Sequence, residues 1–120
     1  MSIEYVSFEV AKLLKQKSFY WACHAYYDRD GFLYINPIST INDDGEIPNS
    51  CIACPTYFMA QRWLREKEDI HIVIECKPDR QYYYKIYYLD TGSLISQADK
   101  CWDSYERTLN EAILEAFKIH

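Results

Sequence analysis

The sequence predicts a single α+β domain in which three helices pack on an antiparallel sheet made of two hairpins. Three observations lead to this prediction. A chain of 120 residues has room for one hydrophobic core. Two pairs of β-prone segments flank turn-forming residues, and three other segments place apolar residues at helical spacing. The expected order along the chain is α-β-β-α-β-β-α.

The first helix is expected over residues 8–17. Val10, Leu13 and Leu14 have helical spacing, and they follow Ser7, whose hydroxyl can accept a hydrogen bond from the first turn. The sequence therefore provides both the buried stripe of a helix and a signal for its start.

The first hairpin is expected to follow this helix. Residues 20–27 and 32–36 form its strands, and residues 28–31 form a turn that ends in a glycine. Residues 37–50 contain several turn-forming residues and no regular pattern. We expect a long loop there, and loops of that length are often functional.

The second helix is expected to begin at Pro55 and to end before Ile70. Proline suits the first helical position because an N–H at that position has no partner within the helix. Cys54 would then be the N-cap residue. The buried stripe would consist of Met59, Ala60, Trp63 and Leu64.

The second hairpin is expected from residues 70–76 and 82–89. A four-residue loop would place Lys85 opposite Ile72, which would put a charge on the core face. Because a slip of one residue exchanges the two faces of a strand, we predict an odd loop length. One face would then carry the isoleucines, and the other would carry Tyr83, Lys85, Tyr87, His71 and Glu75.

The last helix is expected to start after Asp103 or Ser104. Either residue can act as the N-cap, and Asp103 and Glu106 have the spacing of a capping box. The sequence of residues 94–102 is mixed and supports no prediction. The buried stripe of this helix would consist of Tyr105, Leu109, Ala112, Ile113, Ala116 and Phe117.

Composition narrows the range of functions. Twelve of the 120 residues are tyrosine, which can edge a core or offer a surface for stacking. The formal charge of −5 argues against general affinity for nucleic acids, which depends on clustered Lys and Arg. No segment approaches the ~20 apolar residues of a membrane span. The N-terminus lacks the features of a secretory signal, so we expect a cytoplasmic protein.

Cys51 and Cys54 are spaced like metal ligands or a redox pair. A redox role requires a thiolate, and the start of a helix lowers a thiol pKa. Structural zinc requires four ligands, and the sequence offers one such pair without a second. No metal or other cofactor is therefore predicted, and Cys51 and Cys54 are kept as candidates for a cysteine-dependent site.

Motifs along most of the chain carry a family resemblance. They are Phe8 to Lys15, Pro55-Thr56, Ala60 to Glu66, Ile70-His71-Ile72, Tyr82 to Ile86, and Tyr105 to Ala116. Together they resemble a group of small proteins encoded by phages, prophages and other mobile elements of the Bacteroides group. The resemblance implies a cytoplasmic accessory protein of uncharacterised function, and it supplies no catalytic residues.

The sequence as a whole predicts a non-enzymatic binding protein rather than an enzyme. Its partner would be another protein or a second copy, bound through the aromatic sheet face or the 37–50 loop. Two alternatives stay open: single-stranded nucleic acid stacked on the same face, and a zinc or redox site at Cys51 and Cys54. The predicted binding residues are Tyr83, Lys85, Tyr87, Arg80 and His71.

Overall fold

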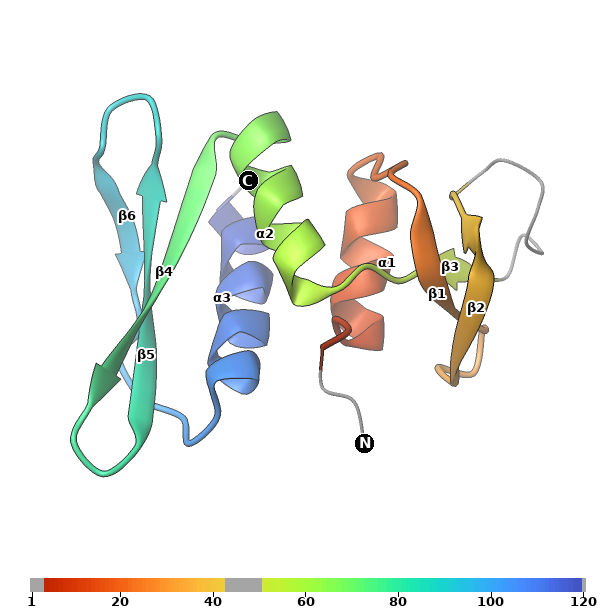
Figure 1. Cartoon of the computed structure of the whole chain (residues 1–120). Helices are drawn as coiled ribbons and strands as arrows, with labels where there is room; N and C mark the ends of the chain where they lie inside the picture. The colour runs from red at the N-terminus through yellow and green to blue at the C-terminus, as the bar shows by residue number, and fades with distance from the viewer. Residues whose placement is uncertain (1–3, 43–50, 120) are drawn as a thin grey trace. The chain divides into compact units, whose positions relative to one another are not determined.

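The computed structural model describes residues 4–42 and 51–119, except for the side chains of residues 36–40 (Figure 1). The chain forms two compact units, residues 1–56 and residues 57–120. In the described part of the chain, no helix is both long and apolar enough to cross a membrane.

The first unit contains one helix and a three-stranded antiparallel sheet. Its elements are α1 (Phe8–Gln16), β1 (Cys23–Tyr27), β2 (Leu33–Thr40) and β3 (Ile52–Ala53), and the strand order is β2-β1-β3. The prediction that Ser7 caps α1 is confirmed, because the Val10 N–H donates to the Ser7 hydroxyl at 3.2 Å.

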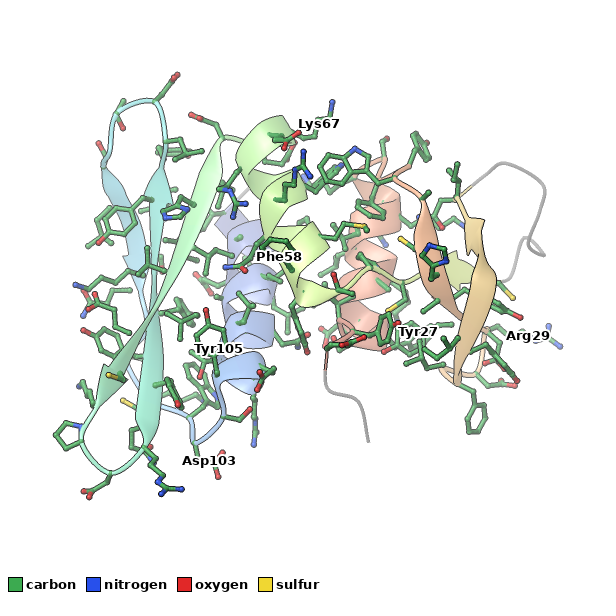
Figure 2. The ribbon with its side chains drawn as sticks, viewed as in Figure 1. Tyr27, Arg29, Phe58, Lys67, Asp103 and Tyr105 are labelled. Carbon is green, nitrogen blue, oxygen red and sulfur yellow. The ribbon has the colours of Figure 1, made fainter. Side chains whose placement is uncertain are left out.

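Strand β1 provides much of the core of this unit. Its residues alternate between buried and more exposed positions, with Cys23, Ala25 and Tyr27 buried. The ring of Tyr27, which Figure 2 labels, meets Phe8 of α1 edge to face, with 5.3 Å between the ring centroids. Its hydroxyl donates to the Val6 carbonyl at 2.6 Å, so the phenol satisfies its polar end inside the core.

The second unit contains two helices and another three-stranded antiparallel sheet. Its elements are α2 (Tyr57–Lys67), β4 (Ile70–Lys77), β5 (Gln81–Tyr88), β6 (Leu94–Gln97) and α3 (Tyr105–Ile119), and the strand order is β4-β5-β6. Helices α2 and α3 lie on the same side of this sheet (Figure 1). The core between them contains Leu64, Ile70, Ile72, Ile86, Leu109 and Ile113.

The predicted register of the β4–β5 hairpin is confirmed. Its loop has three residues, 78–80, so Ile72 lies opposite Ile86 and Val73 lies opposite Lys85. Asp79 and Arg80 have positive φ angles of 67° and 60°, which allow the tight reversal. The charge of Lys85 is thereby kept off the face that packs against the helices.

The start of α2 differs from the prediction. The helix begins at Tyr57, so Cys54 is not its N-cap. The Val6 N–H donates to the Pro55 carbonyl at 3.1 Å, and Thr56 forms a β-bridge with Tyr5. These contacts hold residues 55–56 extended, a conformation that proline also accepts, and the helix therefore starts later.

The other predicted boundaries are mostly close to the observed ones. Helix α3 is capped by Ser104, whose hydroxyl accepts from the Arg107 N–H at 3.2 Å. The predicted 37–50 loop is wrong for residues 37–40, which belong to β2, and residues 43–50 lie outside the described part. The pairing of β1 with β2 is irregular between Cys23 and Ala25. Because the regular ladder of hydrogen bonds is interrupted there, β2 can include Pro37.

The α+β class, with its three helices and antiparallel hairpins, is confirmed in the described residues. The two hairpins belong to separate sheets rather than to one. Each sheet also has a third strand, β3 or β6, which the sequence did not predict.

Candidate functional site

The sheet of the second unit has one packed face and one face that we call the open face. Alternate residues of β4 and β5 point to the packed face, where α3 contacts both strands and α2 contacts β4. No described element of this unit covers the other side of the sheet (Figure 1). The open face consists of His71, Val73, Glu75, Lys77, Gln81, Tyr83, Lys85, Tyr87, Leu94 and Gln97.

Four of the five predicted binding residues lie together on this face. His71 is directly opposite Tyr87 on the neighbouring strand, while Tyr83 and Lys85 occupy the next two open-face positions of β5. All four are half-buried. Arg80, the fifth residue, is exposed in the loop at one end of the face. The structure thus brings the predicted set together, and its role in binding stays a prediction.

The central cation of the open face is already paired. The Lys85 ammonium lies 3.0 Å from a carboxylate oxygen of Glu75, and this hydrogen bond raises the pKa of Lys85. Lys77 places its ammonium 5.1 Å from the centre of the Tyr83 ring, within range of a cation–π interaction. Lys77 is not among the predicted binding residues because the predicted strand ended at residue 76, whereas β4 runs to Lys77 and places it on this face.

His71 contributes an unsatisfied polar atom to the open face. Its Nδ1 is shielded from solvent and has no hydrogen-bond partner among the described residues. A polar atom left in that state costs about 1–3 kcal/mol, so most buried polar atoms are paired. This nitrogen therefore stands out among the polar atoms of the unit.

Charge is distributed unevenly along the open face. Lys77 and Arg80 lie at the end formed by the β4–β5 loop, together with Asp79. At the opposite end the Leu89 N–H donates to the Asp69 carbonyl, and the Asp90 N–H donates to the Asp69 carboxylate at 3.2 Å. Two basic side chains therefore lie at one end of the face, and two aspartates lie in the turns beyond its other end.

The tyrosines of β5 divide between the two faces of the sheet. Tyr84 stacks on Trp102 with 5.8 Å between the ring centroids, and burial raises the pKa of Tyr84. Tyr82 meets Tyr105 edge to face, with 5.9 Å between the ring centroids; Tyr105 lies at the start of α3 (Figure 2). These two edge the core, whereas Tyr83 and Tyr87 are left for the open face. One strand therefore carries tyrosines that edge the core and tyrosines that lie on the open face.

The thiols of Cys51 and Cys54 are buried rather than poised for reaction. The Cys54 thiol donates to the Val6 carbonyl at 3.4 Å, and burial raises the pKa of Cys54 to about 12. The lowered pKa expected for a thiol at a helix start is wrong, because Cys54 precedes the helix by three residues. Across residues 4–42 and 51–119, no three His, Cys, Asp or Glu side chains form a group that could hold a metal ion.

A second exposed surface lies in the first unit, on and beside β2. Four consecutive apolar residues are exposed there by 37–65%, namely Phe32, Leu33, Tyr34 and Ile35. Tyr34 stacks on Tyr26 with 5.3 Å between the ring centroids, and its hydroxyl donates to Asp28 at 3.1 Å. In the sequence, this surface corresponds to a run of uncharged apolar residues. Such a run also fits a buried strand, so the sequence alone does not show that these side chains are exposed.

Comparison of the chain with protein-family models, curated proteins and solved structures found no match. The geometry of the open face is therefore the basis on which a function can be inferred.

Proposed function

We propose that this chain is a non-enzymatic protein-binding protein whose contact surface is the open face. The observation that carries the proposal is the contrast between the two faces of one sheet. One face is filled by α2 and α3, while the other holds half-buried tyrosines under no described element of its unit. The motifs along the chain support, as a further part of the proposal, a cytoplasmic accessory role in a phage or other mobile element.

The residue types of the open face suit a protein interface. Tyrosine buries a large apolar surface on contact, loses little side-chain entropy and keeps a hydroxyl for the rim. Tyr83 and Tyr87 lie four residues apart on β5, and Lys85 lies between them on the same face, opposite Val73 of the neighbouring strand. Around them lie charged residues that can fix the orientation of a partner.

Charge favours a protein partner over single-stranded nucleic acid. On and beside the open face, three cations (Lys77, Arg80 and Lys85) meet four carboxylates (Asp69, Glu75, Asp79 and Asp90). Lys85 is bound to Glu75 and is not free to neutralise a phosphate. A strand-binding surface needs a net positive groove beside its stacking rings.

Site-specific photo-cross-linking in cells that express the chain tests the proposal. A photoreactive phenylalanine at Gln97, an exposed position of the open face, should yield a discrete protein adduct. The matched control carries the same group at Phe58, which is 75% exposed on α2 (Figure 2). Tyr87→Ala should reduce the adduct at position 97 several-fold, while Tyr105→Ala removes a tyrosine on the helix side and should leave it unchanged.

Three outcomes would overturn the proposal. They are no adduct at position 97, equal adducts at positions 97 and 58, and an adduct that a nuclease removes. The last result would favour the alternative in which the open face binds single-stranded nucleic acid. Fluorescence polarisation with labelled single strands at low salt, using Tyr83→Ala and Tyr87→Ala, would then measure that binding.

A further inference from the structure

We infer that the outer edge of β2, at residues 33–35, pairs with the same edge of a second copy of this chain and joins the two sheets into one. This inference goes beyond the proposed function, because it concerns the first unit and does not involve the open face. It follows from the direction of the backbone groups at this edge and from the side chains beside them.

Strand β2 lies at an edge of its sheet. Among the described residues it pairs with β1 alone, and β1 lies between β2 and β3. The Asp28 N–H donates to the Phe32 carbonyl at 3.0 Å, so this pair and every second pair after it are the hydrogen-bonded pairs of the ladder. Leu33 and Ile35 belong to the alternate pairs, and their N–H and C=O groups therefore point away from β1.

The other side of β1 supports the same assignment. Ala25 lies opposite Ile35 in the ladder, yet its carbonyl accepts from the Cys54 N–H at 2.9 Å, on the side of β3. The backbone groups of Ile35 thus have no partner in β1. Neither Leu33 nor Ile35 has another backbone partner among the residues that the structure describes. The outer edge therefore offers two donors and two acceptors to an extended backbone.

The side chains at this edge are apolar and exposed. Leu33, Tyr34 and Ile35 are exposed by 37%, 46% and 60%. Natural edge strands are usually protected against pairing by charged side chains, a proline or a bulge. Residues 33–35 include neither a charge nor a proline, and the irregular pairing of β2 begins only beyond Ile35. The edge is therefore accessible to another extended segment over a short length.

The same edge of a second copy supplies such a segment. A two-fold axis perpendicular to the sheet, passing between the two β2 strands at Tyr34, makes these strands antiparallel. Leu33 of each copy then lies opposite Ile35 of the other, and their outward N–H and C=O groups face each other. Both of these symmetric pairs can exchange two hydrogen bonds, which satisfies all the free backbone groups of residues 33 and 35.

The side chains also match across this axis. Leu33 packs beside Ile35 of the other copy on one face of the joined sheet. On the other face the two copies of Tyr34 meet at a non-hydrogen-bonded position, where side chains lie close together. Tyr34 is already held for this contact, because it stacks on Tyr26 at 5.3 Å and donates to Asp28 at 3.1 Å. The stack of Tyr26 and Tyr34 would therefore continue into the second copy.

Charge favours the antiparallel arrangement. The charged residues nearest to this edge are Asp28, Arg29 and Asp30, in the turn that precedes β2. Antiparallel strands place the two turns at opposite ends of the contact, each beside residues 36–42 of the other copy, which include no charged residue. Parallel strands would bring the two turns together with their like charges, and like charges in contact oppose association.

The length of the edge sets the expected strength. Residues 33–35 of each copy form a contact much smaller than a standard interface, which has about 20–30 residues a side. We therefore expect a weak and reversible dimer with a Kd on the order of 100 µM. Backbone hydrogen bonds and the apolar side chains beside them would both contribute to it.

Sedimentation equilibrium of the purified full chain, from about 10 µM to about 1 mM, tests the inference. Ile35→Pro removes an N–H that points away from β1, a change that edge strands tolerate. It should weaken the dimer by about tenfold or more, because each symmetric pair loses a hydrogen bond. Ile35→Ala keeps the N–H and should weaken the dimer by about threefold. Tyr87→Ala, on the open face, should change the Kd by less than about twofold.

Circular dichroism would establish that each variant is folded. If Ile35→Pro does not fold, Ile35→Lys replaces it, because it adds to an exposed position the charge that protects natural edges. The lysine variant should also weaken the dimer by about tenfold or more.

Cross-linking tests the register. Cys76 and Cys101, the free thiols that are not buried, are first replaced by serine. In that background Tyr34→Cys should form a disulfide-linked dimer with oxidised glutathione, since the two Cα atoms at the axis lie about 4.5 Å apart. The matched control is Tyr26→Cys, on the same face but one strand further from the edge. Its two thiols lie about 14 Å apart across the joined sheet and should not cross-link.

Three outcomes would overturn the inference. They are a chain that stays monomeric at about 1 mM, a dimer that Ile35→Pro and Ile35→Lys leave unchanged, and equal cross-linking at positions 34 and 26. Failure of the proposed function is a separate result, because it is read from the adduct at position 97 of the open face. Loss of that adduct would leave the pairing of the β2 edges untouched.

Discussion

Tyrosine and cysteine show how position alone decides what a side chain does in this chain. Tyr83 and Tyr84 are neighbours in sequence, yet one lies on the open face and the other stacks on Trp102. Cys54 is buried beside the Val6 carbonyl, whereas Cys76 is exposed near the end of β4. The chemistry open to each residue therefore depends on its face and burial, not on its residue type alone.

The buried thiols predict how stability depends on alkaline pH. Burial raises the pKa of Cys23 and of Cys54 from 9.0 to about 12. Below pH 9 both states keep these protons, so the stabilisation is complete. Between about pH 9 and 12 the unfolded chain loses them first, and the free energy of unfolding falls. For one thiol the slope is up to about 1.4 kcal/mol per pH unit.

Urea unfolding across this pH range measures the effect. The fall in unfolding free energy should be shallower in Cys54→Ala than in the unaltered chain, since one contributing thiol is gone. Cys76→Ala removes an exposed thiol and should leave the slope unchanged. If Cys54→Ala and the unaltered chain had parallel pH profiles, the Cys54 thiol would not titrate as its burial implies.

At the scale of elements, the sequence predicts the hairpin of β4 and β5 down to its register. The alternating isoleucines of β4 and the charge of Lys85 on β5 exclude a loop with an even number of residues. Because alternate residues of a strand point to opposite faces, the register then shows which residues lie on the open face. Strands β3 and β6 could not be predicted in the same way. The first has two residues, and the second, Leu94–Gln97, is too short to show a period.

Long-range contacts explain the remaining differences at this scale. Residues 55–56 stay extended because Val6 and Tyr5 bind them, and these partners lie some fifty positions away in the sequence. Likewise, alternation shows that a segment is a strand but does not show which sheet it joins. The ion pair of Glu75 with Lys85 depends on the rotamers of both side chains, which their spacing in the sequence does not determine.

Two isoleucines that differ in burial test which strand faces are covered. Ile86 is fully buried on the packed face of β5, whereas Ile35 of β2 is 60% exposed. Ile86→Ala should lower the free energy of unfolding by about 2–5 kcal/mol, because it leaves a cavity beneath the helices. Ile35→Ala, the same chemical change, should cost less than about 0.5 kcal/mol. Urea unfolding of both variants would show similar costs if β2 were covered as β5 is.

At the scale of the whole molecule, the chain length and the contact pattern support different expectations. A chain of 120 residues predicts one domain, and that prediction stands untested. The contacts nevertheless group into residues 1–56 and residues 57–120, and each unit has its own sheet and its own buried apolar residues. Whether the second unit folds without the first therefore distinguishes a single domain from two.

We expect the fragment 57–120 to fold alone. Helices α2 and α3 and the strands β4 and β5 together enclose a continuous core, and units of about 60 residues can fold without a partner. Thermal circular dichroism should show a cooperative transition for this fragment. The shorter fragment 57–104 lacks α3 and with it Leu109 and Ile113, so it should show none. If neither fragment unfolded cooperatively, the second unit would depend on residues 1–56, and the one-domain expectation would be favoured.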